Sequence, residues 1–406
     1  MREKSYRKQD ILKLIEGLDI SPTMYKNATE KYKAVASYLQ EKGLECEIFP
    51  QSSFSLGTVI RPYKQSKDAA YDLDFFCCIN EDKEKTTPDH IKNIVKDKLC
   101  ASETYAKLLQ NEEWDKCWTL EYASINEIGF NMDIVPSVHE SDVNIKELEK
   151  LGVPLEVATL SNAITNKQNN NYSWLTSNPK AYKMWFEKIN KPFLENERQS
   201  RRQKLYEMHK SFYNSIEEIP EDIERSSLQR VIQILKHHRD RYFCRIQKEK
   251  LKPTSAIITT ICAEIASEKN PSLTVFELLQ EIVNDFEIYS KHQTLSEYDF
   301  SKNYSSKRII KKINGKWEII NPVNPKDNLA DSWNDGTNKA ALFFSWVEKL
   351  KNDYLTSLDF NDNDFVALLE NNFGTDYIKK HLDLEKYTRY EPNIIVNTPK
   401  PWSCDL

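Results

Sequence analysis

Three aspartates in apolar, strand-like segments are the residues of this sequence best suited to bind metal ions. Asp72 and Asp74 stand two apart in the segment 71–79, YDLDFFCCI, and Asp133 stands in the segment 130–136, FNMDIVP. The period of two in a strand places the side chains of Asp72 and Asp74 on one face. Burying two carboxylates among apolar neighbours is costly unless a cation lies between them. Hard divalent cations such as Mg²⁺ take oxygen ligands and keep phosphate in the same shell. A D-x-D pair alone is also typical of a turn or a solvated edge, but the apolar flanks at both sites favour metal binding.

A loop rich in hydroxyl groups precedes these segments. Residues 51–58 read QSSFSLGT. Hydroxyl groups, backbone N–H groups and a glycine before a turn or helix can bind phosphate oxygens. An ordinary serine-rich loop has the same composition. Only the position of this loop before the aspartates therefore indicates that it binds phosphate.

The elements expected around these residues divide the chain into two halves. The first half alternates between helix and strand: a helix over 22–43, strands over 44–49, 71–79, 118–125 and 128–135, and a helix within 82–103. Helices dominate after residue 178, at 179–189, 195–212, 223–243, 254–267, 274–289 and 339–355. Asn314-Gly315 predicts a hairpin with a type I′ turn, and the run 169–171 predicts a loop.

This pattern predicts an α+β fold in which a lobe with a mixed sheet precedes a mainly helical lobe, with the active site in the cleft between them. We expect the first lobe over residues 1–185, including an N-terminal helix, the helical lobe over 186–390 and a loose tail over 391–406.

Composition and charge exclude several classes of protein. The 406 residues include only 8 glycines, against about 28 at the usual frequency, which disfavours glycine repeats and the dinucleotide fingerprint. A net charge of −5 argues against a protein that coats nucleic acid. No signal peptide and no membrane span is visible, so we expect a cytoplasmic protein whose eight cysteines are reduced, mostly core residues.

The order of loop, D-x-D and third aspartate resembles the nucleotidyltransferase superfamily of DNA polymerase β, whose pattern is hG[GS]…[DE]h[DE]…h[DE]h. Ser53, Gly57 and Thr58 match the phosphate loop, and Gln51 opens it. Asp72, Asp74 and Asp133 match the catalytic carboxylates. One position departs from the pattern: Ser52 stands where the family has glycine, and serine adopts positive φ only at a cost. This difference affects the expected backbone geometry of the loop and not the chemistry of the carboxylates.

The second half narrows the resemblance to the bacterial cGAS/DncV-like nucleotidyltransferases, the CD-NTases. The segments similar to that family are 177–186, 228–243, 252–260 and 315–333, and the likeness covers most of 25–350. It implies that Lys236 and Ser255 contact the donor triphosphate. From the residues alone, Lys236 also suits a solvated basic helix face, shared with His237 and His238, and Ser255 suits a plain helix start. We assign no catalysis to the two histidines.

The resemblance implies an enzyme that joins NTPs, with ATP as one of them, into a cyclic di- or trinucleotide and releases pyrophosphate. Two Mg²⁺ ions, replaceable by Mn²⁺, are expected at Asp72, Asp74 and Asp133. The product is expected to act on an effector protein in antiphage (CBASS) defence. No membrane and no polymeric nucleic acid is expected as a partner.

Two alternatives remain open at this point. A transferase acting on linear oligonucleotides or RNA ends would need a basic track, which the net charge of −5 mildly disfavours. A nucleotide-binding pseudoenzyme would bind ATP without releasing pyrophosphate, although all three carboxylates are present.

Overall fold

The computed structural model describes residues 2–61, 63–64, 67–68, 71–125, 128–208, 224–304 and 308–387. The chain forms two compact units. The first joins 1–17 to the segment from 356 onward, and the second spans 18–355. The expected domain boundary near 185 falls inside the second unit, and the expected tail over 391–406 lies outside the described residues.

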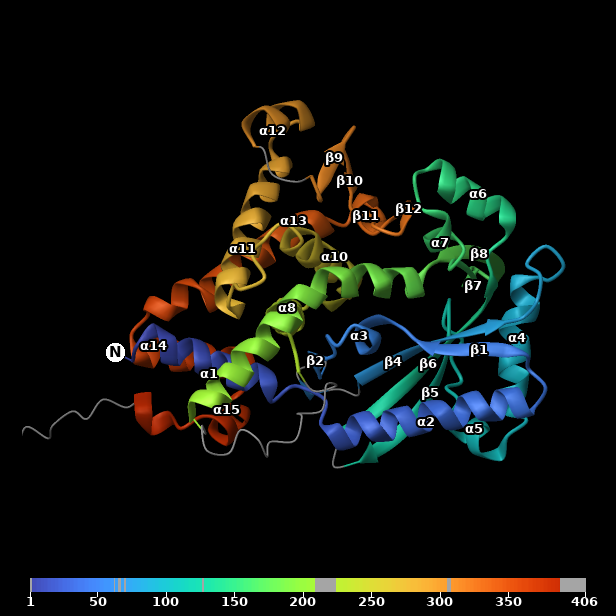
Figure 1. The fold of residues 1–406 in the computed structure, drawn as a ribbon, viewed down its shortest axis with the longest axis horizontal. Helices are drawn as coiled ribbons and strands as arrows, with labels where there is room; N and C mark the ends of the chain where they lie inside the picture. The colour runs from blue at the N-terminus through green and yellow to red at the C-terminus, as the bar shows by residue number, and fades with distance from the viewer. Residues whose placement is uncertain are drawn as a thin grey trace, which may run out of the picture. The chain divides into compact units, whose positions relative to one another are not determined.

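A mixed sheet is the centre of the N-terminal part of the larger unit (Figure 1). Its strand order is β1-β4-β6-β7-β8, with β5 paired to β6. β4 and β6 are parallel, and the other neighbours are antiparallel. The strands are β1 (Cys46–Pro50), β4 (Tyr71–Ile79), β5 (Trp118–Ile125), β6 (Ile128–His139), β7 (Asn162–Gln168) and β8 (Asn171–Ser177), with a small ribbon of β2 (Tyr63–Lys64) and β3 (Lys67–Asp68) beside them.

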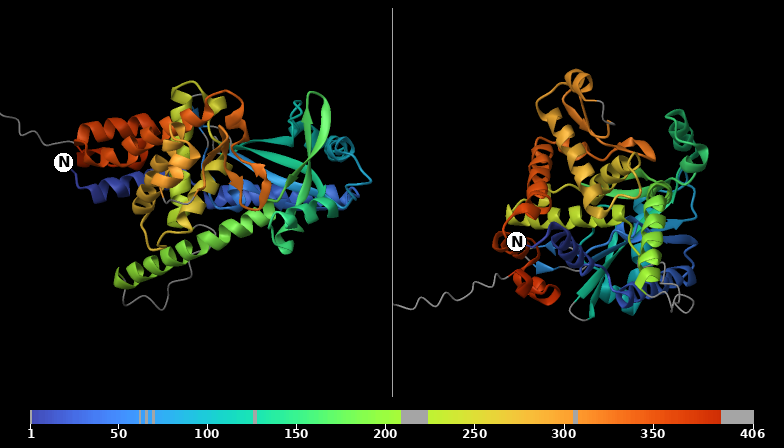
Figure 2. Two further views of the ribbon diagram at one scale, coloured as in Figure 1. Left: turned by 90° about the horizontal axis from the view of Figure 1, so that it is seen from above. Right: turned by 60° about the vertical axis from the view of Figure 1, so that its left-hand side comes forward.

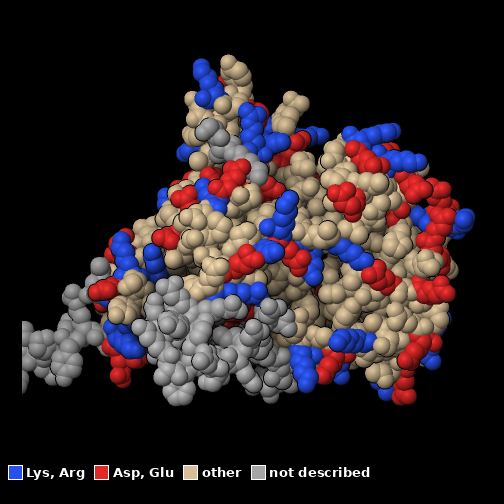
Figure 3. Space-filling model, in the orientation of Figure 1, with Lys and Arg blue, Asp and Glu red and all other residues tan. Residues whose placement is uncertain are grey.

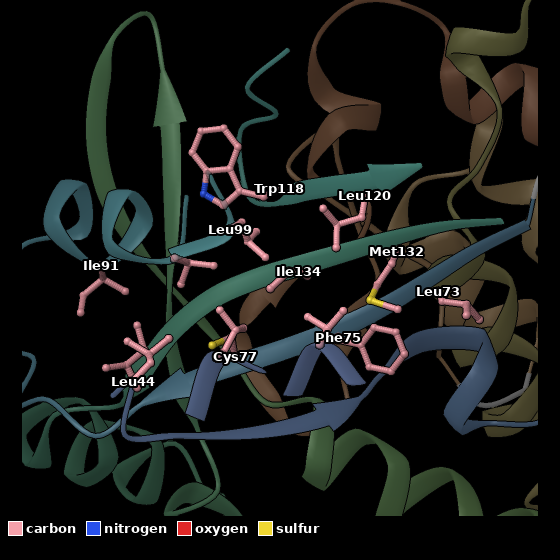
Figure 4. Close-up of a cluster of buried hydrophobic side chains, with 14 of the residues drawn as sticks. Leu44, Leu73, Phe75, Cys77, Ile91, Leu99, Trp118, Leu120, Met132 and Ile134 are labelled. Carbon is pink, nitrogen blue, oxygen red and sulfur yellow. The ribbon is translucent and has the colours of Figure 1, made fainter. Parts of the chain in front are cut away.

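One face of this sheet carries the core of the lobe (Figure 4). Leu73 and Phe75 of β4 and Met132 of β6 are buried there against α2 (Pro22–Glu41) and α4 (Pro88–Cys100). Because side chains alternate along a strand, Asp74 and Asp133 belong to the opposite face. The shorter helices of this lobe are α3 (Ser52–Ser55), α5 (Glu103–Leu108), α6 (Asp142–Lys150) and α7 (Leu155–Ala158).

The rest of the larger unit is mainly helical, as expected. Its central helix is α9 (Ser227–Arg245), which contacts α8, α10, α11 and α13. The other helices of this part are α8 (Pro179–Met208), α10 (Ser255–Ala266), α11 (Val275–Ser290), α12 (Glu297–Asn303) and α13 (Lys339–Tyr354), with short 3-10 turns at Glu249–Leu251, Lys291–Gln293 and Asp331–Asn334. The α+β fold predicted from the sequence is confirmed.

The smaller unit brings together the two ends of the described chain. It consists of α1 (Lys4–Glu16), α14 (Asp362–Phe373) and α15 (Thr375–His381), with 3-10 turns at Thr356–Asp359 and Leu384–Tyr387. Arg7 holds it together: the guanidinium is fully buried and donates to the carbonyls of Leu358 and Phe360 and to the Asp362 carboxylate.

One expectation about the elements is wrong and another is incomplete. The two helices expected at 179–189 and 195–212 are one helix, α8, which contains Pro192 and is described as far as Met208 (Figure 2). The segment 169–171 is the turn of the β7–β8 hairpin: Asn169 and Asn170 adopt φ of 48° and 65°, and Asn171 begins β8. Asparagine tolerates this left-handed backbone better than most residues.

The hairpin predicted at Asn314-Gly315 is confirmed. β9 (Lys311–Ile313) and β10 (Lys316–Glu318) pair across these two residues, which both have positive φ. A second short ribbon follows, made of β11 (Ile320–Asn321) and β12 (Asn324–Asn328).

The described cysteines are all free thiols, and Cys77, Cys78 and Cys262 are buried, whereas Cys100 is exposed. Cys404 lies outside the described residues. No helix in the described part of the chain combines the length and the apolar character needed to cross a bilayer.

Candidate active site

Asp74 and Asp133 lie side by side in the centre of the sheet. They are direct register partners in the parallel pair of β4 and β6, so their strands bring them to adjacent positions on the same face. Both side chains are half-buried, and both line one cavity of about 520 Å³. The Asp133 carboxylate also accepts a hydrogen bond from Thr119, its neighbour on β5. We call this space the carboxylate cavity.

The third expected carboxylate is Asp72. Its backbone lies in β4 opposite Asn131 of β6, but its side chain lies outside what the structure describes. Among the described side chains no group of three or more His, Cys, Asp or Glu is placed to hold a metal ion. Two adjacent carboxylates on one face nevertheless have the right chemistry for a hard divalent cation.

The loop over residues 51–58 lies next to these carboxylates because its backbone is tied to β4. The Gln51 N–H donates to the Asp74 carbonyl at 2.9 Å, and the Thr58 N–H donates to the Ser53 carbonyl at 2.9 Å. Gln51, Ser53 and Thr58 line a second cavity of about 240 Å³, which we call the loop pocket. The two cavities share Ser52, Ser53, Lys236 and Ser255, so they are neighbouring parts of one cleft.

Ser52 adopts positive φ, at 55°. This is the left-handed region that glycine occupies freely and that costs other residues about 1–2 kcal/mol. At Ser52 this loop therefore has a backbone conformation that favours glycine, which is the residue of the superfamily pattern at this position.

Gly57 lies where the loop contacts Gln229 of α9, and it lines neither cavity. It has φ of 65°, and a Cβ atom at this position would lie 2.4 Å from Gln229 Nε2. That amide donates to the Leu56 carbonyl at 2.9 Å, while the rest of the Gln229 side chain completes a capping box with Ser226 at the start of α9. Gly57 thus allows α9 to approach the loop closely.

Lys236 lies on α9 beneath the same loop. It is 4% exposed, and its ammonium donates to the Thr58 carbonyl at 3.0 Å. Burial lowers the pKa of Lys236 to about 7, and the nearby charge of Arg239 acts in the same direction, whereas Asp240 and Asp74 oppose the change. The Thr58 hydroxyl is fully buried and has no hydrogen-bond partner among the described residues. A phosphate group at this place would meet both a cation and a hydroxyl donor.

Ser255 is the first residue of α10, and Arg239 fixes its surroundings. The Arg239 guanidinium donates to the Ser255 hydroxyl at 3.2 Å and to the Pro253 carbonyl at 3.1 Å. Asp240 balances this charge by accepting from Arg239 and from Lys252. Burial alone would raise the pKa of Asp240, but these two cations lower it.

Arg239, Asp240 and Lys252 line the carboxylate cavity, and the sequence-based prediction of the site did not include them. For Arg239 and Asp240 the signal was the spacing on α9, because residues three and four positions after Lys236 lie on the same face of a helix. Cys117 is another neighbour: burial raises its pKa to about 12, and the charges of Asp133 and Asp74 contribute.

The solvated basic face considered for residues 236–239 is absent, and the expectation for His237 and His238 is wrong. Both side chains are buried, because other helices pack around α9. His238 Nε2 lies 3.0 Å from the Asp353 carboxylate, and its Nδ1 accepts from the Trp346 indole at 3.0 Å. Because the indole can only donate, the Nε2 atom of His238 carries the proton. These contacts join α9 to α13.

Comparisons with known proteins place this geometry in a known fold. No protein-family model matches the chain. A curated relative, a c-di-GMP synthase from Roseivirga ehrenbergii, is 27% identical over 384 residues, or 93% of this chain and 86% of the relative.

Two solved structures are similar along nearly their whole length. One is the CD-NTase CdnG of Bradyrhizobium diazoefficiens in complex with GTP, with a TM-score of 0.65, 17% identity and coverage of 92% of this chain and 98% of the other. This chain has the CD-NTase fold. CdnC of Escherichia coli MS115-1, solved in complex with a HORMA protein, agrees, with a TM-score of 0.55, 13% identity and coverage of 90% and 96%. The resemblance and the polymerase β-like fold inferred from the sequence are therefore confirmed.

Proposed function

We propose that this chain is a nucleotidyltransferase that joins two NTPs into a cyclic dinucleotide and releases pyrophosphate. The observation that carries the proposal is the placement of Asp74 and Asp133 on adjacent strands, in a cleft also lined by the serine loop and by Lys236. The name of the curated relative, c-di-GMP synthase, and the CD-NTase fold support the same reaction.

The chain's own residues have separate tasks in this reaction. Asp72, Asp74 and Asp133 would hold two Mg²⁺ ions, whose charge stabilises the attacking and leaving oxygens of an in-line displacement at the α-phosphate. Asp133 also lies where it could orient the acceptor hydroxyl. Ser53, Thr58, Lys236 and Ser255 would bind the donor triphosphate, since hydroxyl groups and ammonium groups are its natural partners.

The net charge of −5 favours small substrates over a polymer in this proposal. Over the face shown in Figure 3, acidic and basic side chains are mixed in the part that the structure describes. An enzyme that extends RNA ends would need a track of basic residues along which the polymer could lie. The expected effector protein and the antiphage role remain predictions from the resemblance.

The proposal is tested by the Asp74→Asn variant, which keeps the shape of the side chain and removes its charge. We expect the variant to fold with a melting temperature equal to or above that of the wild type, because one of two adjacent carboxylates loses its charge. We expect it to lose about 100-fold or more of the rate of pyrophosphate release. Asp335→Asn, an exposed carboxylate outside both cavities, is the matched control and should keep full activity. Equal rates for Asp74→Asn and the wild type would refute the assignment.

A further inference from the structure

Ser52 has three features that the proposed function does not explain. Its backbone adopts a φ of 55°, its side chain is exposed, and it lines both the loop pocket and the carboxylate cavity. A residue in an unfavourable backbone region persists when its surroundings impose that conformation, and such residues cluster at ligand-binding sites. Ser52 therefore needs an explanation beyond the loop geometry, which a glycine would satisfy at lower cost.

The unusual backbone is imposed by neighbours and does not depend on the Ser52 hydroxyl. On one side the Gln51 N–H is bonded to the Asp74 carbonyl at 2.9 Å. On the other side the Ser52 carbonyl accepts from the Leu56 N–H at 3.2 Å and from the Ser55 hydroxyl at 3.0 Å. The Ser52 hydroxyl itself has no hydrogen-bond partner in the part of the chain that the structure describes, which leaves it available to a ligand.

The hydrogen-bond donors around Ser52 favour an anionic ligand. The four residues shared by the two cavities are three serines and Lys236, which can all donate hydrogen bonds to an anion. The buried Thr58 hydroxyl, which lacks a partner among the described residues, lies in the same wall of the loop pocket. A group at the junction of the two cavities would thus meet several donors, with Ser52 at its solvent side.

We propose that the Ser52 hydroxyl donates a hydrogen bond to a phosphate oxygen of the bound NTP at the junction of the two cavities. The inference rests on the proposed function, and it assigns Ser52 as a binding residue for the triphosphate in addition to Ser53. In this account the left-handed backbone aims the hydroxyl into the cleft, a contact that glycine at the same position cannot provide.

Two substitutions separate the hydroxyl from the backbone. Ser52→Ala removes the hydroxyl and keeps the unfavourable φ, whereas Ser52→Gly removes both. Because a hydrogen bond to a charged group is lost in each case, we expect the KM for NTP to rise about tenfold in both variants, with kcat little changed. The melting temperature of Ser52→Gly should equal or exceed that of the wild type, because the backbone strain is relieved.

Gln247→Gly is the matched control, since Gln247 also has a φ of 55° and lines neither cavity. It should leave the KM unchanged. Binding of a non-hydrolysable NTP and of the unphosphorylated nucleoside, both with Mg²⁺, should show that only the triphosphate loses affinity in the Ser52 variants. An unchanged KM in both Ser52 variants, or an improved kcat/KM in Ser52→Gly alone, would overturn the inference. A wild-type protein that neither binds nor converts NTPs would instead contradict the proposed function itself.

Discussion

Lys236 is the residue whose chemistry depends most on its surroundings. Its ammonium lies under the loop over residues 51–58, donates to the Thr58 carbonyl and is almost completely buried. Since burial lowers its pKa to about 7, a large fraction of Lys236 is neutral in the free protein just above neutral pH. In the proposed function a bound triphosphate would stabilise the charged form, and nucleotide binding would then be linked to protonation of Lys236.

The first prediction follows from this linkage. At pH 8, where the phosphates of free NTP are already ionised, binding of NTP to the wild type should take up a fraction of a proton, and the affinity should fall as the pH rises above about 7. Calorimetry in two buffers of different ionisation enthalpy measures the proton uptake. Lys236→Met should bind NTP more weakly at pH 7 and take up no proton at pH 8. Equal uptake by the two proteins would show that Lys236 is not the titrating group.

At the residue scale, the sequence indicated which side chains could do chemistry but not how they are buried. Asp74 and Asp133 stood out by residue type and by their neighbours, whereas Lys236 was indicated by the family resemblance. The burial of His237 and His238 was not predictable from a single basic segment, because it depends on helices distant in the sequence that pack around α9. For the same reason, the pairing of Arg239 with Ser255 became visible only in the fold.

At the scale of elements, the site depends on the close approach of α9 to the loop before β4. The contact is made where Gly57 faces Gln229, whose amide bonds to the loop carbonyl of Leu56. The same helix carries Lys236 two turns further on. A change at this contact should therefore affect both stability and NTP binding.

Gly57→Ala tests this contact, and Gly43→Ala is its matched control. Both glycines have positive φ, at 65° and 79°, but a Cβ at Gly43 would meet nothing within 4 Å. We expect both variants to lose stability from backbone strain, and Gly57→Ala to lose about 2 kcal/mol more in urea unfolding, because the new methyl displaces the Gln229 amide. Equal losses would mean that the Gln229 side chain moves aside at no cost.

The contact of α9 with α13 has a predictable pH dependence. Burial lowers the pKa of His238 below its usual value, although the bond to Asp353 opposes the change. The unfolded chain therefore takes up a proton more readily than the folded one as the pH falls below about 6.5, and stability is lost in that range. His237 is buried and has a lowered pKa as well, so it adds to the same loss.

Urea unfolding of the wild type and of His238→Gln at pH 7.5 and pH 5.5 measures this effect. The free energy of unfolding of the wild type should fall by about 1 kcal/mol more than that of the variant between the two pH values. The matched control is His139→Gln, at an exposed histidine, which should retain the full wild-type loss. A wild-type loss no larger than that of His238→Gln would contradict the account.

The strands that carry the aspartates were predictable because each is a short apolar run. The β7–β8 hairpin was missed because its turn is formed by Asn169 and Asn170, a pair that suits either a loop or a type I′ turn. The single helix α8 was missed because Pro192 normally breaks a helix. In both cases the missing information was tertiary packing.

At the scale of the whole molecule, the chain ends form their own unit, which the sequence did not indicate. Its two segments are separated by more than 300 residues, and nothing local marks them as partners. Arg7 joins them by donating to carbonyl groups of the 3-10 turn at Thr356–Asp359 and of Phe360. The unit should therefore depend strongly on this one buried cation.

Arg7→Met should expose α14 and α15 to hydrogen exchange, because the carbonyls of Leu358 and Phe360 lose a buried cationic donor, and the Asp362 carboxylate loses its ion pair. We expect a loss of about 3–5 kcal/mol in the protection of this unit. Lys4→Met is the control: Lys4 also pairs with a carboxylate, Asp359, but both side chains are more than half exposed, so the change should cost about 1 kcal/mol or less. Unaltered protection in Arg7→Met would show that other contacts hold the unit together.

The central claim is that the cleft lined by Asp74, Asp133 and Lys236 joins NTPs into a cyclic product. The most direct test incubates the protein with Mg²⁺ and the four NTPs, each labelled at the α-phosphate in turn, and then treats the products with phosphatase. Phosphatase removes the 5′-terminal phosphates of a linear dinucleotide, and with them part of its label, whereas a cyclic dinucleotide has no terminal phosphate. The account therefore predicts a wild-type product that phosphatase leaves unchanged in mass and in label, and no such product from Asp74→Asn. A wild-type product that loses mass and part of its label to phosphatase, or a product that Asp74→Asn forms at the same rate, would contradict it.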